Sequence, residues 1–214
     1  MWIKRIARGA LEAVGLYAPY TLVTKGPLKE DGWFRSLRGR ESVDAQGRPI
    51  PWLTYPAIEF LSRHVRPEMS VFEYGCGNST LWWAGRVREV IACEHDPAWI
   101  EKLGPLAPAN VTIRHVELQP AGDYSKTVAA YPGRFDVVVI DGRHRASCAP
   151  HAVNGLKPSG VIVWDDTYRE EYRPGIDHLL GNGFRQVEFV GLIPMFNQKS
   201  ETSVFYRDGN VFGL

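Results

Sequence analysis

The sequence contains little cysteine, no long apolar run and almost no net charge, and each shortage excludes a class of protein. Its three cysteines, Cys76, Cys93 and Cys148, are odd in number and form no CxxC pair. A disulfide scaffold and a cysteine zinc site are therefore not expected. Such sparse cysteine fits a reducing compartment, and we expect a cytoplasmic protein.

Apolar stretches are short as well. The longest, such as residues 135–140, fall far short of the roughly 18 residues that a membrane-spanning helix needs, so we expect no transmembrane segment.

The 25 Lys and Arg residues nearly balance the 24 Asp and Glu residues, for a formal net charge of +1. This balance gives no electrostatic footprint for a nucleic-acid duplex, and we expect no nucleic-acid partner.

The first seventeen residues predict an amphipathic helix. Its apolar face would hold Trp2, Ile3, Ile6, Ala7, Ala10, Leu11 and Val14, and its basic face Lys4, Arg5 and Arg8. Such a helix could dock on the main domain or pack in a homo-oligomer. It could instead lie on a membrane surface or bind a partner.

Residues 24–51 lack periodicity and are rich in Gly, Pro and charged residues, which predicts an irregular segment. Too few residues precede it to form a second core, so we expect residues 1–53 to be an amino-terminal helix and an irregular cap or lid. Residues 54–214 would form the main domain. Arg35, Arg38 and Arg40 in the cap would suit an anionic ligand, or they are simply solvated.

From Thr54 onward, short β-rich runs alternate with helical patterns. Thr54 is a candidate N-cap, and Pro56 follows in the first turn of the helix that opens the domain. The runs are residues 71–74, 90–93, 111–116, 135–140 and 160–164, and the helical intervals are 81–87, 97–103 and 146–156. This alternation predicts an α/β fold with a mostly parallel sheet and helices on both faces.

The carboxyl-terminal part departs from that alternation. A helix over residues 176–180 precedes two further β-rich runs, residues 184–190 and 203–207. Their connection is short for a parallel crossover, so we expect an antiparallel pair at one edge of the sheet.

The first strand leads into a glycine-containing turn, with the sequence EYGCGNST at residues 73–80. Gly75 and Gly77 would let the backbone turn tightly and approach a ligand, and the helix that follows offers free N–H groups. The pattern indicates a nucleotide or nucleoside cofactor. The third glycine of the dinucleotide fingerprint is missing near Thr80, which disfavours NAD(P).

An acidic residue, Glu94, ends the next strand. A carboxylate at that position can accept hydrogen bonds from both hydroxyls of a ribose, although a solvated strand end is the alternative. Asp96 precedes Pro97 and is a candidate helix N-cap that could also border an adenine ring.

Residues 54–207 resemble the S-adenosylmethionine-dependent methyltransferases with a Rossmann-like fold. The resemblance rests on FEYGCGNST, IACEHDPAW, FDVVVIDG and GVIVWDD. It implies a seven-stranded sheet whose last strand is reversed. It also implies a methionine site at Glu73, Gly75, Cys76, Gly77, Asn78 and Ser79, a ribose site at Glu94 and an adenine site at His95 or Asp96. Glu117 is a loose match to a third acidic residue near the adenine.

Three carboxylates follow neighbouring strands: Asp141 after the fourth strand, and Asp165 and Asp166 after the fifth. Ligands of open α/β sheets bind at this edge. Converging carboxylates repel one another unless protons or a divalent cation neutralise them, and an all-oxygen ligand set suits Mg²⁺. Alternatively, Asp141 orients the cofactor, and one of the paired aspartates caps the next helix.

The turn DGRH at residues 141–144 resembles metal-dependent O-methyltransferases of the catechol and macrolide-sugar types. The resemblance implies that Asp141, Asp165 and Asp166 bind a metal and that His144 is the catalytic base beside Asp141. This sequence departs from the pattern at Arg143 and Arg145, which would lower the basicity of His144 or bind an anionic acceptor.

We therefore expect methyl transfer to a hydroxyl of a small molecule, such as a sugar or another polyhydroxy metabolite. A metal-independent N-, C- or O-methyltransferase and a non-catalytic cofactor-binding subunit are the alternatives.

Overall fold

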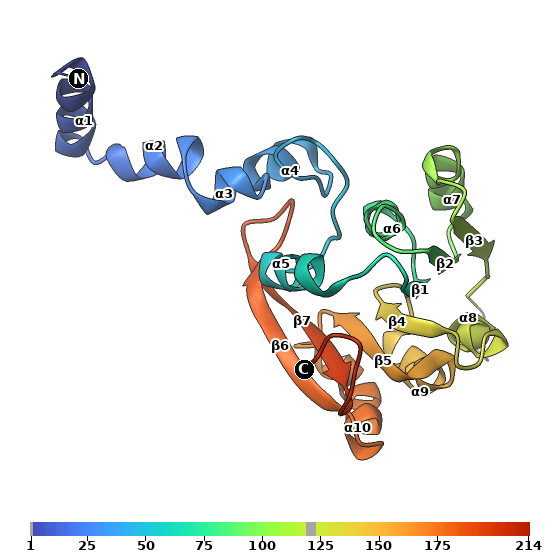
Figure 1. Cartoon of the computed structure of the whole chain (residues 1–214). Helices are drawn as coiled ribbons and strands as arrows, with labels where there is room; N and C mark the ends of the chain where they lie inside the picture. The colour runs from blue at the N-terminus through green and yellow to red at the C-terminus, as the bar shows by residue number, and fades with distance from the viewer. Residues whose placement is uncertain (1, 119–122) are drawn as a thin grey trace.

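A single seven-stranded sheet organises the computed structural model (Figure 1). The model describes residues 2–118 and 123–214, with side chains from residue 8 onward except that of Asp123. The strands are β1 (Ser70–Tyr74), β2 (Glu89–Glu94), β3 (Val111–His115), β4 (Phe135–Ile140), β5 (Leu156–Asp165), β6 (Arg185–Leu192) and β7 (Lys199–Tyr206). Their order is β3-β2-β1-β4-β5-β7-β6, and β7 runs antiparallel to the other six strands. The predicted fold class and the antiparallel ending are confirmed.

The core lies on both faces of the sheet because its central strands are buried on both sides. In β4, Val138 packs in one apolar cluster and the adjacent Val139 in the other. The cluster around Val138 includes residues of α9 (Arg145–Gly155) and α10 (Arg173–Gly181), and the cluster around Val139 includes residues of α5 (Tyr55–His64) and α6 (Asn78–Ala84). Continuous apolar runs such as 137–140 are typical of such strands.

Local capping fixes where the helices begin. The Thr54 hydroxyl accepts a hydrogen bond from the N–H of Ala57 at 3.4 Å, and the Asp96 carboxylate accepts one from Ala98 at 2.9 Å, at the start of α7 (Pro97–Leu103). Both predicted N-caps are confirmed. The remaining short elements of this domain are α8 (Asp123–Lys126), η1 (Gly104–Leu106), η2 (Thr127–Ala130) and η3 (Glu170–Tyr172).

The amino-terminal part consists of α1 (Trp2–Ala13), α2 (Tyr17–Thr24), α3 (Pro27–Glu30) and α4 (Trp33–Gly39), and α1 and α2 extend away from the sheet (Figure 1). The expectation of an irregular segment over residues 24–51 is therefore wrong for α3 and α4. Gly26 and Gly32 have φ near +83° and +82°, so these glycines separate short helices rather than mark one loop. No helix within the described ranges is long and apolar enough to cross a membrane.

Residues 33–53, here called the cap segment, pack on the domain. The Ser36 hydroxyl donates to the carbonyl of Val43 at 2.6 Å and accepts from its N–H at 3.1 Å, so the buried interior of the segment is hydrogen-bonded. The indole of Trp33 donates to the carbonyl of Phe196, between β6 and β7, at 3.1 Å. The cap segment thus reaches the sheet edge where β6 ends.

Candidate active site

The turn between β1 and α6 brings two glycines to the carboxyl edge of the sheet. Gly75 has φ of +95°, and a Cβ there would lie 3.2 Å from the Cα of Gly142. Gly77 has extended backbone, and a Cβ there would meet no atom within 4 Å. The protein's own packing thus requires a glycine at position 75, whereas Gly77 borders open space that a ligand could enter.

Glu73, on strand β1, stabilises this turn through hydrogen bonds. Its carboxylate accepts a 2.5 Å hydrogen bond from the Thr80 hydroxyl, which accepts one from the N–H of Gly77 at 3.0 Å. Burial raises the pKa of Glu73 to about 8, against the lowering effect of the Ser79 and Thr80 hydroxyls. The second carboxylate oxygen, Oε1, is buried without a hydrogen-bond partner among the described residues. A polar group on a bound ligand would satisfy this atom.

Glu94 links the end of β2 to the glycine turn. It is only 4% exposed, which excludes the solvated strand end considered above. Its Oε2 accepts from the N–H of Cys76 at 3.0 Å, and Oε1 accepts from the N–H groups of His95 and Asp96 at 2.7 and 2.9 Å. Because Oε2 accepts only one of these bonds, it retains capacity for a ribose hydroxyl.

The other predicted cofactor residues surround the same turn. Asn78 donates from Nδ2 to the carbonyl of Ser42 at 2.8 Å, so the turn contacts the cap segment. Burial raises the pKa of the Cys76 thiol, which argues against a nucleophilic role. The ring nitrogen Nδ1 of His95 lies 2.7 Å from Glu94 Oε1. Glu117 is exposed beyond the end of β3.

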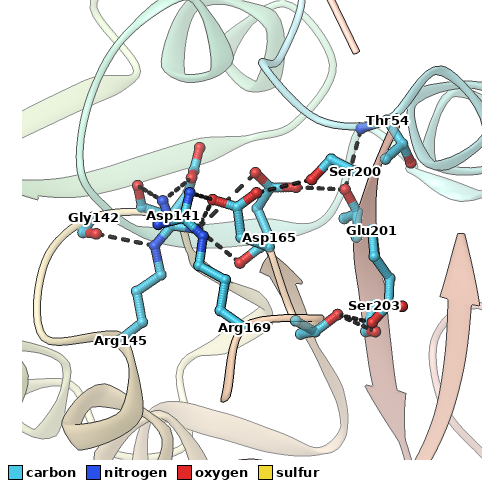
Figure 2. Close-up of polar contacts among 12 residues, drawn as sticks. Thr54, Asp141, Gly142, Arg145, Asp165, Arg169, Ser200, Glu201 and Ser203 are labelled. Carbon is cyan, nitrogen blue, oxygen red and sulfur yellow. Dashed lines mark hydrogen bonds and ion pairs between the residues drawn. The ribbon is translucent and has the colours of Figure 1, made fainter. Parts of the chain in front are cut away.

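The three predicted carboxylates converge at the ends of β4 and β5, and Arg145 lies among them (Figure 2). Arg145 Nη2 is 2.9 Å from Asp141 Oδ1. Its Nη1 is 3.6 Å from Asp166 Oδ2 and 4.0 Å from Asp165 Oδ2. Arg169 Nη2 adds a second cation at 2.7 Å from Asp166 Oδ2. These five residues are here called the acidic cluster.

Hydroxyl donors from β7 complete the acidic cluster. Thr202 donates to Asp165 Oδ1 at 2.6 Å, and Ser200 donates to Asp166 Oδ1 at 2.8 Å. Burial raises the pKa of Asp141 to about 6 although Arg145 lowers it, and burial together with Asp141 and Asp166 raises that of Asp165 well above its usual range. Protons and guanidinium groups thus share the neutralisation of these carboxylates.

The expected Mg²⁺ site at Asp141, Asp165 and Asp166 is not supported. Across residues 2–118 and 123–214, no group of His, Cys, Asp or Glu side chains is arranged to hold a metal ion. The physical reason is Arg145, whose guanidinium lies between the three carboxylates. These side chains therefore do not fit a divalent ion in the arrangement observed.

His144 lies at the rim of this site. It has a left-handed backbone with φ of +51° directly before α9, and it is exposed. Its ring has no hydrogen bond or ion pair to any residue in the described part of the chain. The ring is thus accessible, and its role as a base stays a prediction.

Sequence reasoning missed the partners that hold the acidic cluster together. Arg145 stands four residues after Asp141, but Asp141 precedes α9, so the i,i+4 rule for helix faces does not predict this ion pair. Ser200 and Thr202 come from β7, a strand distant in sequence, and no local pattern identifies them.

Two polar cavities lie elsewhere in the described structure. One, of about 200 Å³, adjoins the acidic cluster, and its lining includes Thr167, Arg169 and Glu201. The other, of about 320 Å³, lies at the opposite edge of the sheet, and its lining includes Arg88, Asn110 and Arg134.

Comparison with known proteins gives a family match for part of the chain. Residues 72–167 match a family model described as a methyltransferase domain. This segment contains the glycine turn, Glu94, Asp141 and the paired aspartates. No curated protein matches the sequence.

Solved structures resemble the chain at low identity. A spermidine synthase from Thermotoga maritima has a TM-score of 0.55 and 15% identity, over 69% of this chain and 56% of that one. A tRNA (m1A58) methyltransferase from Aquifex aeolicus has a TM-score of 0.53 and 14% identity, over 73% of this chain and 70% of that one. A third structure is a 1,6-didemethyltoxoflavin-N1-methyltransferase from Burkholderia thailandensis with bound S-adenosylhomocysteine. It has a TM-score of 0.52 and 13% identity, over 71% of this chain and 76% of that one.

These likenesses establish the fold and leave the substrate open. The chain spans little more than half of the spermidine synthase. Because a tRNA methyltransferase is among the matches, the expected exclusion of nucleic acid is not supported, and nothing here identifies a metal-dependent O-methyltransferase. Residues 72–167 match a methyltransferase domain, and the sheet that contains them has the Rossmann-like fold of S-adenosylmethionine-dependent methyltransferases.

Proposed function

We propose that this protein is an S-adenosylmethionine-dependent methyltransferase that acts on a hydroxyl of a small molecule such as a sugar or another polyhydroxy metabolite. The observation that carries the proposal is the glycine turn beside Glu94. Open space at Gly77 adjoins a buried carboxylate on the neighbouring strand, within the segment that matches a methyltransferase domain. This combination suits a nucleoside cofactor.

The residues around the turn fit the cofactor. The methionine part would lie along Glu73, Gly75, Cys76, Gly77, Asn78 and Ser79. Glu94 would accept the ribose hydroxyls through Oε2, and His95 and Asp96 would border the adenine. When bound, S-adenosylmethionine supplies an electrophilic methyl group on a sulfonium.

The acceptor would lie beside Asp141 and His144. The exposed ring of His144 is free to take the hydroxyl proton, and neighbouring Arg143 would favour an acceptor with negative charge. The polar lining of the adjoining cavity supports a polyhydroxy acceptor. The protein's main contribution would be to hold the attacking oxygen at near-attack distance.

We also propose roles for the two parts of the chain. Residues 54–214 would form the cofactor-binding domain, with residues 1–53 as an amino-terminal helix and cap. The contact between Asn78 and Ser42 supports a cap beside the cofactor. The exposed apolar residues of α2 support a homo-oligomeric contact through the amino terminus.

Turnover of methyl-labelled cofactor against a panel of sugars, with and without a chelator, tests this function. We expect transfer to a hydroxyl, with His144→Ala lowering the single-turnover rate by about 10²–10⁴-fold and leaving S-adenosylhomocysteine affinity unchanged. Transfer only to nitrogen, to carbon or to RNA would reject the acceptor. Cofactor binding without any transfer would favour a non-catalytic subunit.

A further inference from the structure

The guanidinium of Arg145 lies where the sequence led us to expect a divalent cation. We propose that Arg145 replaces that cation: it shares with Arg169 the neutralisation of Asp141, Asp165 and Asp166 and positions the ends of β4 and β5, so that the site needs no metal. Its meaning for catalysis rests on the proposed function, but the exclusion of a metal can be measured independently.

The carboxylate oxygens already have donors. Asp165 Oδ1 accepts from Thr202 and Asp166 Oδ1 from Ser200, while Arg169 pairs with Asp166 Oδ2. Arg145 lies within 4.0 Å of each aspartate. Only Asp141 Oδ2 lacks such a partner among the residues described. A Mg²⁺ ion needs near-octahedral oxygen ligation at short distance, so it would have to displace Arg145.

Arg145 is also held by the main chain at both strand ends. It donates to the carbonyls of Asp141 at 3.2 Å, Gly142 at 3.0 Å and Asp165 at 2.7 Å. Its guanidinium carbon lies 5.5 Å from the centre of the Tyr172 ring. A planar cation with several fixed donors meets these demands together, whereas a metal ion or a lysine does not.

This arrangement makes Arg145 a positioning residue. By joining the carbonyls that follow β4 to the end of β5, it fixes the turn that carries His144. The same side chain keeps a latent ligand set of three carboxylates closed to cations.

Terbium luminescence tests the exclusion directly, because Trp164 precedes Asp165 and its indole would sensitise a Tb³⁺ ion bound there. We compare the wild type with Arg145→Met, which removes the guanidinium. Arg143→Met is the matched control, since Arg143 is exposed and has no side-chain contact with the cluster. The double variant Arg145→Met/Asp165→Asn removes one latent ligand.

We expect no saturable Tb³⁺ emission from the wild type or Arg143→Met. Arg145→Met should bind Tb³⁺ at least about tenfold more tightly, and Asp165→Asn should reverse the gain. If Arg145→Met folds only with Tb³⁺ or Mg²⁺ present, the proposal is also supported, because the ion then replaces the guanidinium.

Three results would overturn the proposal. The first is saturable Tb³⁺ or Mg²⁺ binding by the wild type that Asp165→Asn alone removes. The other two are a folded Arg145→Met variant with no gain in Tb³⁺ affinity, and an unfolded Arg145→Met variant that neither ion restores to the folded state. S-adenosylhomocysteine binding by the wild type is measured in parallel. Failure of that binding would count against the proposed function and leave the cation result standing.

Discussion

At the residue scale, glycines of the site differ in what they make room for. A Cβ on Gly142 would lie 2.0 Å from the Tyr124 hydroxyl and 2.9 Å from the N–H of Gly75, whereas one on Gly77 would meet nothing within 4 Å. At Gly142 the protein's own atoms leave no room for a side chain. At Gly77 there is room, and we propose that the cofactor requires the glycine there.

Alanine substitutions separate these two causes. Gly142→Ala should destabilise the fold by about 1–3 kcal/mol through overpacking. Gly77→Ala should change the free energy of unfolding by less than about 0.5 kcal/mol, the usual range where no packing is disturbed. It should nevertheless weaken S-adenosylhomocysteine binding at least about tenfold. Denaturant unfolding and calorimetry provide the measurements, and a Gly77→Ala variant with normal affinity would contradict the cofactor site.

Glu94 combines two roles, and the sequence indicated only one. Glu94→Ala should destabilise the fold as well as the cofactor site, because three partly buried backbone N–H groups donate to this carboxylate. Glu94→Gln keeps an acceptor oxygen and removes the charge. We expect it to weaken S-adenosylhomocysteine binding by about 1.5–3 kcal/mol, the contribution of hydrogen bonds to a charged group. Unchanged affinity in a calorimetric titration would reject the ribose site.

Glu73 makes stability depend on pH. Its pKa rises from 4.5 to about 8 on folding because the carboxyl is buried, so the folded state holds the proton more tightly. The contribution of this group to the free energy of unfolding is fully present below pH 4.5 and is lost as pH rises through about 8. Glu73→Gln removes this loss.

Urea unfolding of the ligand-free wild type and of Glu73→Gln at several pH values checks the effect. The stability of the variant relative to the wild type should increase from pH 5 to pH 9 by an amount on the order of a few kcal/mol. A difference that stays constant over this range would show that Glu73 is ionised at the same pH in the folded and unfolded states.

At the element scale, the sequence predicted most accurately the strands whose residues are all buried. The run from Phe135 to Ile140 coincides with β4 because every one of its residues is buried. Helix α6 begins at Asn78, three residues before the predicted start at residue 81, because glycine and polar residues conceal its first turn. Helix α3 was missed because its four residues are too few to show a helical period, and α4 because its apolar residues stand among glycines and arginines that favour a loop.

The amino-terminal helices have an exposed apolar surface. Val14, Leu16, Tyr20, Leu22 and Val23 are each at least 46% exposed. Deletion of residues 1–26 should therefore convert a homo-oligomer into a monomer, without lowering the melting temperature of the domain or its cofactor affinity. Light scattering on a size-exclusion column measures the mass, and a full-length chain that is already monomeric would contradict this contact.

At the scale of the whole molecule, the site is assembled from three parts of the chain. The cap segment contacts Asn78 at the glycine turn and Phe196 between β6 and β7, and Trp52 stacks on Phe196 at 5.5 Å. The sequence predicted the carboxylates and the turn because they follow strands directly. It could not predict Arg145 among the carboxylates or the β7 hydroxyls, because these contacts depend on how the strand ends meet in space.

A crystal structure of the chain with S-adenosylhomocysteine tests the central claim most directly. We predict that the ligand lies over Gly77, with its ribose hydroxyls on Glu94 Oε2 and its adenine beside His95. Ligand found in the cavity lined by Arg88 and Arg134 at the opposite edge of the sheet, or no ligand at saturating concentration, would contradict the account.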